Sequence, residues 1–182
     1  GDDTALLIAA LKKLGVAIEQ NANQLKVHAP KQLLAYKGKL DLDLAGTSLR
    51  FLVPHCAGTP GAEVELTGNQ RMQERPIGDL VDSLRELGAD IEYLKRTGCP
   101  PLMIRGKQLK ADSPIRINAK QSSQYVSALL LASSLIESPH SALELEVTGE
   151  FTSASYVDMT LDSMRAFGMQ ASREQGSFKI DS

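Results

Sequence analysis

The chain has 182 residues, of which 42% are hydrophobic and 23% are charged, and its formal net charge is −2 at neutral pH. This composition is typical of a globular protein with a buried core. The even mixture of charges argues against a surface for nucleic acid or anionic membrane, so we expect small molecules or proteins as partners, with no nucleic acid and no membrane.

The spacing of cysteines and histidines predicts no disulfide framework and no metal site. Cys56 and Cys99 are far apart and outside any C-x-x-C motif, which is typical of free thiols in a reducing cytosol. The three histidines lack metal-ligand spacing. The most apolar stretch, residues 125–136, is well short of the ~20 residues that span a bilayer, and we recognise no signal peptide. We expect a cytoplasmic protein with no metal and no cofactor.

The first predicted element is an amphipathic helix that begins near Thr4 and ends at Gly15. Counting back 8, 7, 4 and 1 residues from Gly15 reaches apolar side chains, which form one face of a helix. A glycine just after the last apolar residue is the usual left-handed helix stop. A polar turn and the alternating strand "NQLKVHA" follow.

The next stretch begins with an alternating strand, "LDLDL" at 40–44, and a helix in "AGTSLRFLVPHCA" that is apolar enough to be buried. Pro54 lies inside this helix and is expected to kink or shorten it. The strand "VELTG" at 64–68, an amphipathic helix ending at Gly88 and the strand "PPLMIRG" complete the stretch.

The remainder of the chain repeats this order. The segment "QSSQYVSALLLASSLI" is apolar on nearly every side past Tyr125, which predicts a second buried helix. The strand "LEVTG" at 145–149, an amphipathic helix ending at Gly168 and the strand "GSFKIDS" follow.

These elements predict a repeated βαβαββ unit and an α/β (α+β) fold of about two and a half units. We expect one domain over residues 1–182. The second half of a first unit covers 1–39, a second unit covers 40–110 and a third covers 111–182.

Two short segments rich in hydroxyl groups precede the predicted buried helices, Gly46-Thr47-Ser48 and Ser122-Ser123-Gln124. Free backbone N–H groups and the positive end of the helix dipole favour an anion at such positions. Serine and threonine are also the common N-cap residues, worth ~1 kcal/mol without any ligand. For each segment alone, the cap is the simpler interpretation.

Arg75 precedes Pro76, which fits the first position of a helix and leaves Arg75 near the N-cap. A cation there opposes the helix dipole. Arg75 is therefore either a surface residue paired with Glu74 or Asp79, or an anion-binding residue whose guanidinium grips a carboxylate. The spacing leaves both interpretations open.

The segments "LTGNQRMQERPIG", "AGTSLRFL", "QSSQYVSALL" and "TSASYVDMT" cover nearly the whole chain in this order. They resemble the first domain of the 5-enolpyruvylshikimate-3-phosphate (EPSP) synthase family. R-P-I-G after an L-T-G turn and S-S-Q-Y before an apolar helix are long, specific motifs. The resemblance implies an inside-out α/β barrel, in which βαβαββ units have buried helices and outer sheets and substrates bind between two such domains.

The resemblance also implies roles for single residues. Ser122, Ser123 and Ser153 would hold the phosphate of shikimate 3-phosphate, and Gln124 and Tyr156 would reach its ring.

A second set would bind phosphoenolpyruvate: Arg75 its carboxylate or phosphate, with Gln124, and Gly46 beside it with room for glyphosate as well. Leu44 departs from the family, in which most members have asparagine two residues before this glycine, and glyphosate sensitivity therefore does not follow from Gly46 alone.

The implied reaction transfers the enolpyruvyl group of phosphoenolpyruvate to the 5-hydroxyl of shikimate 3-phosphate. Its acid and base groups belong to a second domain, and a K-x-x-S-N-R type segment belongs to an earlier helix; neither has a counterpart in residues 1–182. We expect a monomer that binds substrate without turnover and has the second domain as its partner. The alternatives are a UDP-N-acetylglucosamine enolpyruvyl transferase, which lacks R-P-I-G and S-S-Q-Y, and a non-catalytic module of the same fold that binds a phosphorylated metabolite.

Overall fold

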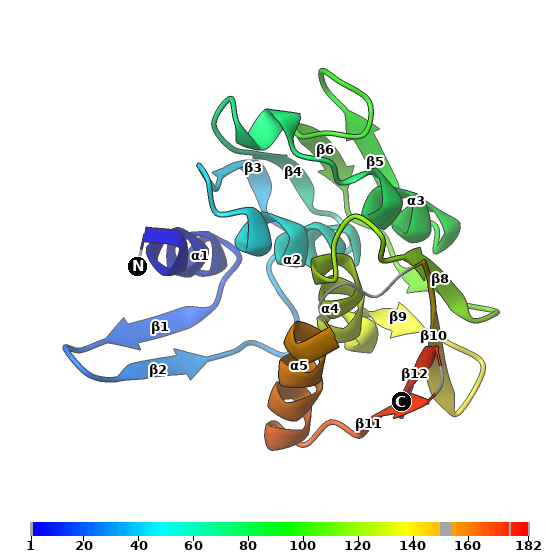
Figure 1. The fold of residues 1–182 in the computed structure, drawn as a ribbon. Helices are drawn as coiled ribbons and strands as arrows, with labels where there is room; N and C mark the ends of the chain where they lie inside the picture. Colours follow the sequence, from blue (N-terminus) through cyan, green and yellow to red (C-terminus); the bar gives the residue numbers. More distant parts are fainter. Residues whose placement is uncertain (1, 150–153, 175, 182) are drawn as a thin grey trace.

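The computed structural model describes residues 2–149, 154–174 and 176–181, and the fold is mixed α/β (Figure 1). Helices in the middle of the molecule have sheets around them, and an N-terminal hairpin projects to one side. In the described residues no helix is both long and apolar enough to cross a membrane.

The N-terminal part consists of a helix and a hairpin. Its elements are α1 (Asp2–Lys13), β1 (Ala17–Gln20) and β2 (Leu25–His28). Gly15 follows α1 with a φ of +91°, which confirms the predicted left-handed stop. The two strands pair antiparallel, and Ile18 is their one buried residue. The hairpin therefore contributes little to the core, whereas Ala10 of α1 and Leu14 after it are buried in the core.

The middle part forms a four-stranded sheet with two helices. Its elements are β3 (Lys37–Asp41), α2 (Gly46–Ala57), β4 (Glu63–Thr67), the 3₁₀ helix η1 (Met72–Glu74), α3 (Gly78–Glu86), β5 (Asp90–Tyr93) and β6 (Leu102–Arg105). The strand order is β3-β4-β6-β5; β3 and β4 are parallel and the other pairs are antiparallel.

The C-terminal part has the same arrangement. Its elements are β7 (Leu109–Lys110), β8 (Ile115–Asn118), α4 (Gln124–Leu131), η2 (Ser133–Leu135), β9 (Ile136–Glu137), β10 (Ala142–Thr148), α5 (Ala154–Ala166), β11 (Ala171–Glu174) and β12 (Ser177–Asp181). The strand order β8-β10-β12-β11 has one parallel pair, β8 and β10, followed by antiparallel pairs. The two short strands β7 and β9 pair separately.

Helices α2 and α4 pack against each other, and apolar side chains on both are almost fully buried, as predicted. Leu49 and Val53 on α2 are at most 1% exposed, and Tyr125 and Leu130 on α4 have no exposed surface. Because each helix buries several faces, its register and its N-terminus are held firmly by packing. The N-termini of these two helices are the predicted anion sites.

One predicted boundary in this region is wrong, and the shortening expected from Pro54 does not occur. The strand predicted at 40–44 ends at Asp41, because the chain turns at Asp43 with a φ of +46°, and Leu44 is exposed in that turn. Helix α2 continues through Pro54 to Ala57. Proline removes one backbone hydrogen bond, and a single loss near the end of a helix with a buried face does not terminate it.

Candidate functional site

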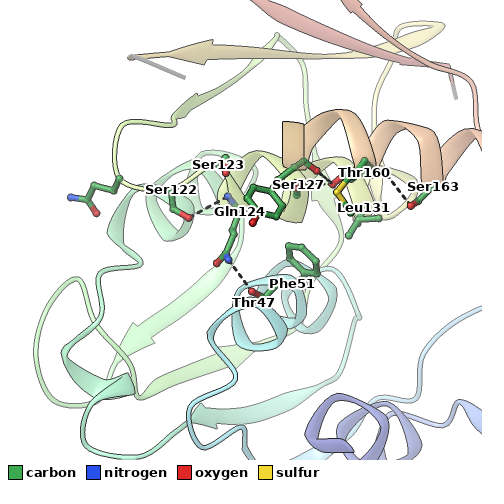
Figure 2. Close-up of a pocket in the computed structure, with 12 residues that line it drawn as sticks. Thr47, Phe51, Ser122, Ser123, Gln124, Ser127, Leu131, Thr160 and Ser163 are labelled. Carbon is green, nitrogen blue, oxygen red and sulfur yellow. Dashed lines mark hydrogen bonds between the residues drawn. The ribbon is translucent and has the colours of Figure 1, made fainter. Parts of the chain in front are cut away.

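The first turns of α2 and α4 meet at the mouth of a pocket of about 530 Å³ (Figure 2). Gln124 Nε2, at the start of α4, donates a hydrogen bond to Thr47 Oγ1 on α2 over 2.8 Å. Four of the predicted substrate-binding residues line this pocket: Ser122, Ser123, Gln124 and Tyr156. The structure therefore brings most of the shikimate 3-phosphate set together.

The N-cap residues of these two helices do not cap them with their side chains, although Ser122 bonds one backbone N–H at the start of α4. The N-cap residues, Ala45 for α2 and Ser123 for α4, make no side-chain cap hydrogen bond. Ser122 Oγ accepts the backbone N–H of Gln124 over 3.2 Å, a contact visible in Figure 2. Since capping does not occupy Ser123, the anion-binding interpretation of this segment gains weight.

Arg75 lies over the start of α2. A Cβ added at Gly46 would come 2.5 Å from Arg75 Nη1, so glycine is what leaves space for the guanidinium. The expected position at a helix N-cap is wrong, because α3 begins at Gly78 with Ile77 as its N-cap residue. Arg75 instead closes η1 with an extended backbone, at φ −80° and ψ 133°.

The alternative of a surface ion pair for Arg75 is not realised. Within the described residues, its guanidinium has no carboxylate of Glu74 or Asp79 within salt-bridge distance, although other arginines do have such partners. An exposed guanidinium without a counterion, beside a helix N-terminus, is well suited to bind an anionic group.

Arg50 is a part of the site that the sequence reasoning missed. Its side chain is buried, with 7% exposed, and Nη1 donates to Gln124 Oε1 over 2.6 Å. Its guanidinium carbon lies 5.5 Å from the centre of the Tyr125 ring. The signal available in the sequence was an arginine in an otherwise apolar helix, "SLRFLV".

The electrostatics of this region are those of a partly desolvated positive centre. Burial lowers the pKa of Arg50; the Tyr125 hydroxyl opposes that change, and the neighbouring charge of Arg75 adds to it. Burial also raises the pKa of Tyr125, so its phenol stays neutral. The pocket lining contains no Asp, Glu, Lys or His among the described residues. The arrangement can bind and orient an anion and offers no evident group for proton transfer.

Ser153 lies outside the described residues, so its predicted role has no structural counterpart here. Tyr156, on the first turn of α5, lines the pocket with 64% of its surface exposed. Within the described residues, no group of three or more His, Cys, Asp or Glu side chains could hold a metal ion.

The family model of EPSP synthase (3-phosphoshikimate 1-carboxyvinyltransferase) matches residues 1–182. The chain belongs to this family. The 3-phosphoshikimate 1-carboxyvinyltransferase of Cupriavidus taiwanensis is 40% identical over 174 residues, which are 95% of this chain and 40% of that protein. The corresponding protein of Ralstonia nicotianae is 42% identical over 175 residues, again 40% of its length.

A solved EPSP synthase structure from Acinetobacter baumannii aligns with a TM-score of 0.77 and 25% identity. The alignment covers 100% of this chain and 40% of that one. The chain thus spans about 40% of the length of the relatives it matches. The resemblance on the R-P-I-G and S-S-Q-Y motifs is confirmed at the level of the family.

Proposed function

We propose that this chain is the shikimate 3-phosphate-binding domain of an EPSP synthase, which also contributes part of the phosphoenolpyruvate site. Family membership and the pocket at the N-termini of α2 and α4 support the proposal. The reaction would transfer the enolpyruvyl group to the 5-hydroxyl of shikimate 3-phosphate.

The observation that carries the proposal is the hydrogen bond from Gln124 to Thr47, residues 77 positions apart. It joins the serine-rich start of α4, which would bind shikimate 3-phosphate, to the start of α2. There Arg75 lies so near Gly46 that a Cβ on this glycine would come 2.5 Å from Nη1. Two residue sets predicted for two different substrates therefore lie side by side. A transfer reaction requires this proximity between donor and acceptor.

The proposed role of each residue follows from the chemistry of its side chain. Ser122 and Ser123, with Ser153, would donate hydrogen bonds to the phosphate at the positive end of α4. Gln124 would contact both substrates and Tyr156 the shikimate ring. Arg75 would bind phosphoenolpyruvate, whose approach to the backbone the missing side chain of Gly46 permits.

We further propose that residues 1–182 form one domain with two and a half βαβαββ units. The expected boundary at 39/40 falls inside β3, so we place it before Lys37 and keep the second boundary at 110/111. The matching strand orders of the two four-stranded sheets support this division. Proton-transfer groups would come from a second domain, because the described residues that line the pocket include no Asp, Glu, Lys or His. The chain by itself would bind both substrates as a monomer and release no phosphate.

An amide NMR titration of this chain with shikimate 3-phosphate, followed by phosphoenolpyruvate, tests the proposal. We expect shifts clustered at residues 122–124 and 154–157 for the first ligand and around Gly46 and Arg75 for the second. UDP-N-acetylglucosamine is the competing ligand and should shift neither cluster. No shifts at saturating shikimate 3-phosphate would refute the proposed function.

A serine pair gives the residue-level control. Ser123→Ala should weaken shikimate 3-phosphate binding roughly tenfold, because one hydrogen bond to a charged group is lost. Its stability should hardly change, since Ser123 makes no cap hydrogen bond. Ser113→Ala, at an exposed loop residue away from the pocket, should leave binding unchanged.

A further inference from the structure

Arg50 occupies the junction of three segments: its own helix α2, the start of α4 and the turn before α3. Its side chain is buried, and its two terminal nitrogens donate in different directions. Nη1 donates to Gln124 Oε1 over 2.6 Å, and Nη2 donates to the carbonyl oxygen of Pro76 over 3.3 Å. The planar fork of the guanidinium makes both contacts at once, from two nitrogens held in a fixed geometry.

The first contact determines the orientation of the Gln124 amide. A guanidinium has donors and no acceptor, so the atom of Gln124 that faces it must be the carbonyl oxygen Oε1. The amide nitrogen Nε2 is then directed toward Thr47 Oγ1, at 2.8 Å. Without Arg50, the two ends of the amide could exchange places, because Thr47 Oγ1 can donate as well as accept.

The second contact holds the peptide that follows Arg75. The Pro76 carbonyl accepts hydrogen bonds from Arg50 Nη2 and from the Tyr125 hydroxyl, the latter over 2.6 Å. Two donors occupy both acceptor sites of this oxygen. The backbone from which the Arg75 side chain extends toward Gly46 is therefore anchored to α2 and α4.

Arg50 has no acidic partner that would explain its burial. Within the described part of the chain it forms no ion pair, and its polar partners are neutral groups: the Gln124 amide, the Pro76 carbonyl and the Tyr125 hydroxyl. A buried cation without a counterion is costly. The cost is consistent with a role at a site that receives anions, because a bound anion would compensate the charges of Arg50 and Arg75 together.

We propose that Arg50 is a positioning residue that couples the two substrate sites, by orienting the amide of Gln124 and by fixing the Pro76 carbonyl next to Arg75. This inference rests on the proposed function. Arg50 itself acts through these two groups and holds their geometry in the absence of ligand.

The test compares Arg50→Lys and Arg50→Met with the matched control Arg85→Lys. Arg85 also donates from two nitrogens to a carbonyl, that of Ile91, and its guanidinium carbon lies 5.0 Å from the centre of the Tyr93 ring. Both arginines thus donate to a backbone carbonyl beside a tyrosine ring. Arg85 is exposed and also pairs with Asp82, and only Arg50 touches the site. Thermal unfolding reports the structural part of each substitution.

The decisive readout is the side-chain NH₂ resonance pair of Gln124 in the ligand-free chain. In Arg50→Lys we expect the chemical shifts of these resonances to change and the order parameter of the Gln124 side-chain amide to fall. Lysine keeps the positive charge but lacks the two-pronged guanidinium that holds the amide. Binding of shikimate 3-phosphate and of phosphoenolpyruvate should each weaken roughly tenfold. Arg85→Lys should leave the Gln124 resonances and the affinities for both substrates unchanged, even if it lowers the unfolding temperature as much as Arg50→Lys does.

A double-mutant cycle with Gln124→Met separates the two arms of the network. In the Gln124→Met background, Arg50→Lys should cost little further shikimate 3-phosphate affinity but should still weaken phosphoenolpyruvate binding through Pro76. Additive losses for shikimate 3-phosphate, or unchanged Gln124 resonances in Arg50→Lys, would overturn the positioning role.

If the wild-type chain bound neither substrate, the proposed function would fail, and the coupling of binding sites would fail with it. The ligand-free Gln124 resonances would in that case still decide whether Arg50 orients the amide.

Discussion

Replacing Gly46 with alanine tests how the start of α2 controls the Arg75 guanidinium. The new Cβ would come 2.5 Å from Arg75 Nη1 and 3.2 Å from its Cζ. Ordinary contact begins at 3.4 Å, so the guanidinium has to move by about 0.9 Å. The side chain is exposed and flexible and can move at little cost to folding. Gly46 has no positive φ, so its backbone accepts alanine.

The expected effect is on phosphoenolpyruvate binding. A displacement of this size breaks a directed hydrogen bond to a carboxylate or phosphate, which is worth roughly 1.5–3 kcal/mol. The dissociation constant for phosphoenolpyruvate should therefore rise roughly 10- to 100-fold. Shikimate 3-phosphate binding should stay within about twofold of wild type, because Gln124 and its partners lie outside the displaced contact.

The assay is calorimetric or NMR titration of the two variants Gly46→Ala and Gly78→Ala. Gly78 is also the first residue of its helix, but a Cβ there would have no neighbour closer than 3.7 Å. Gly78→Ala should bind both ligands as wild type does. Wild-type phosphoenolpyruvate affinity in Gly46→Ala, with the protein folded, would refute the reasoning that this glycine exists to leave room for Arg75.

Two further predictions concern stability. Tyr125→Phe removes the 2.6 Å hydrogen bond to the Pro76 carbonyl and keeps the buried ring, so the free energy of unfolding should fall by about 1–2 kcal/mol in urea denaturation; an unchanged midpoint would mean that Arg50 alone satisfies this carbonyl. Burial lowers the pKa of His55, whose Nδ1 bonds the Phe51 carbonyl over 2.7 Å as a neutral donor. Because the unfolded chain binds a proton near pH 6.5 and the native chain does not, stability should fall as pH drops below about 6.5. His55→Gln should flatten that slope, and an NMR titration that finds a His55 pKa above its ordinary value would contradict the prediction.

Several elements were predictable because their signals are local. Gly15, Gly88 and Gly168 all have φ near +90°, as expected for helix stops. The apolar periodicity of α2 and α4 correctly indicated buried helices. Boundaries were less predictable: a turn at Asp43 ends the first strand early, and α3 starts two residues after Pro76. The first and last residues of a helix or strand depend on how the adjoining segments of the chain pack.

The sequence by itself determined the order of helices and strands, the family and the kinds of residue available to bind anions, because periodicity, glycine stops and motifs are properties of short segments. Only the tertiary structure decided how those residues meet. Arg50 and Gln124 are 74 positions apart, and their contact exists because α2 and α4 pack together. The same packing makes Arg50 a buried cation. A local sequence pattern cannot predict such a contact. The geometry of the contact arises because the apolar faces of two separate helices are buried in one core.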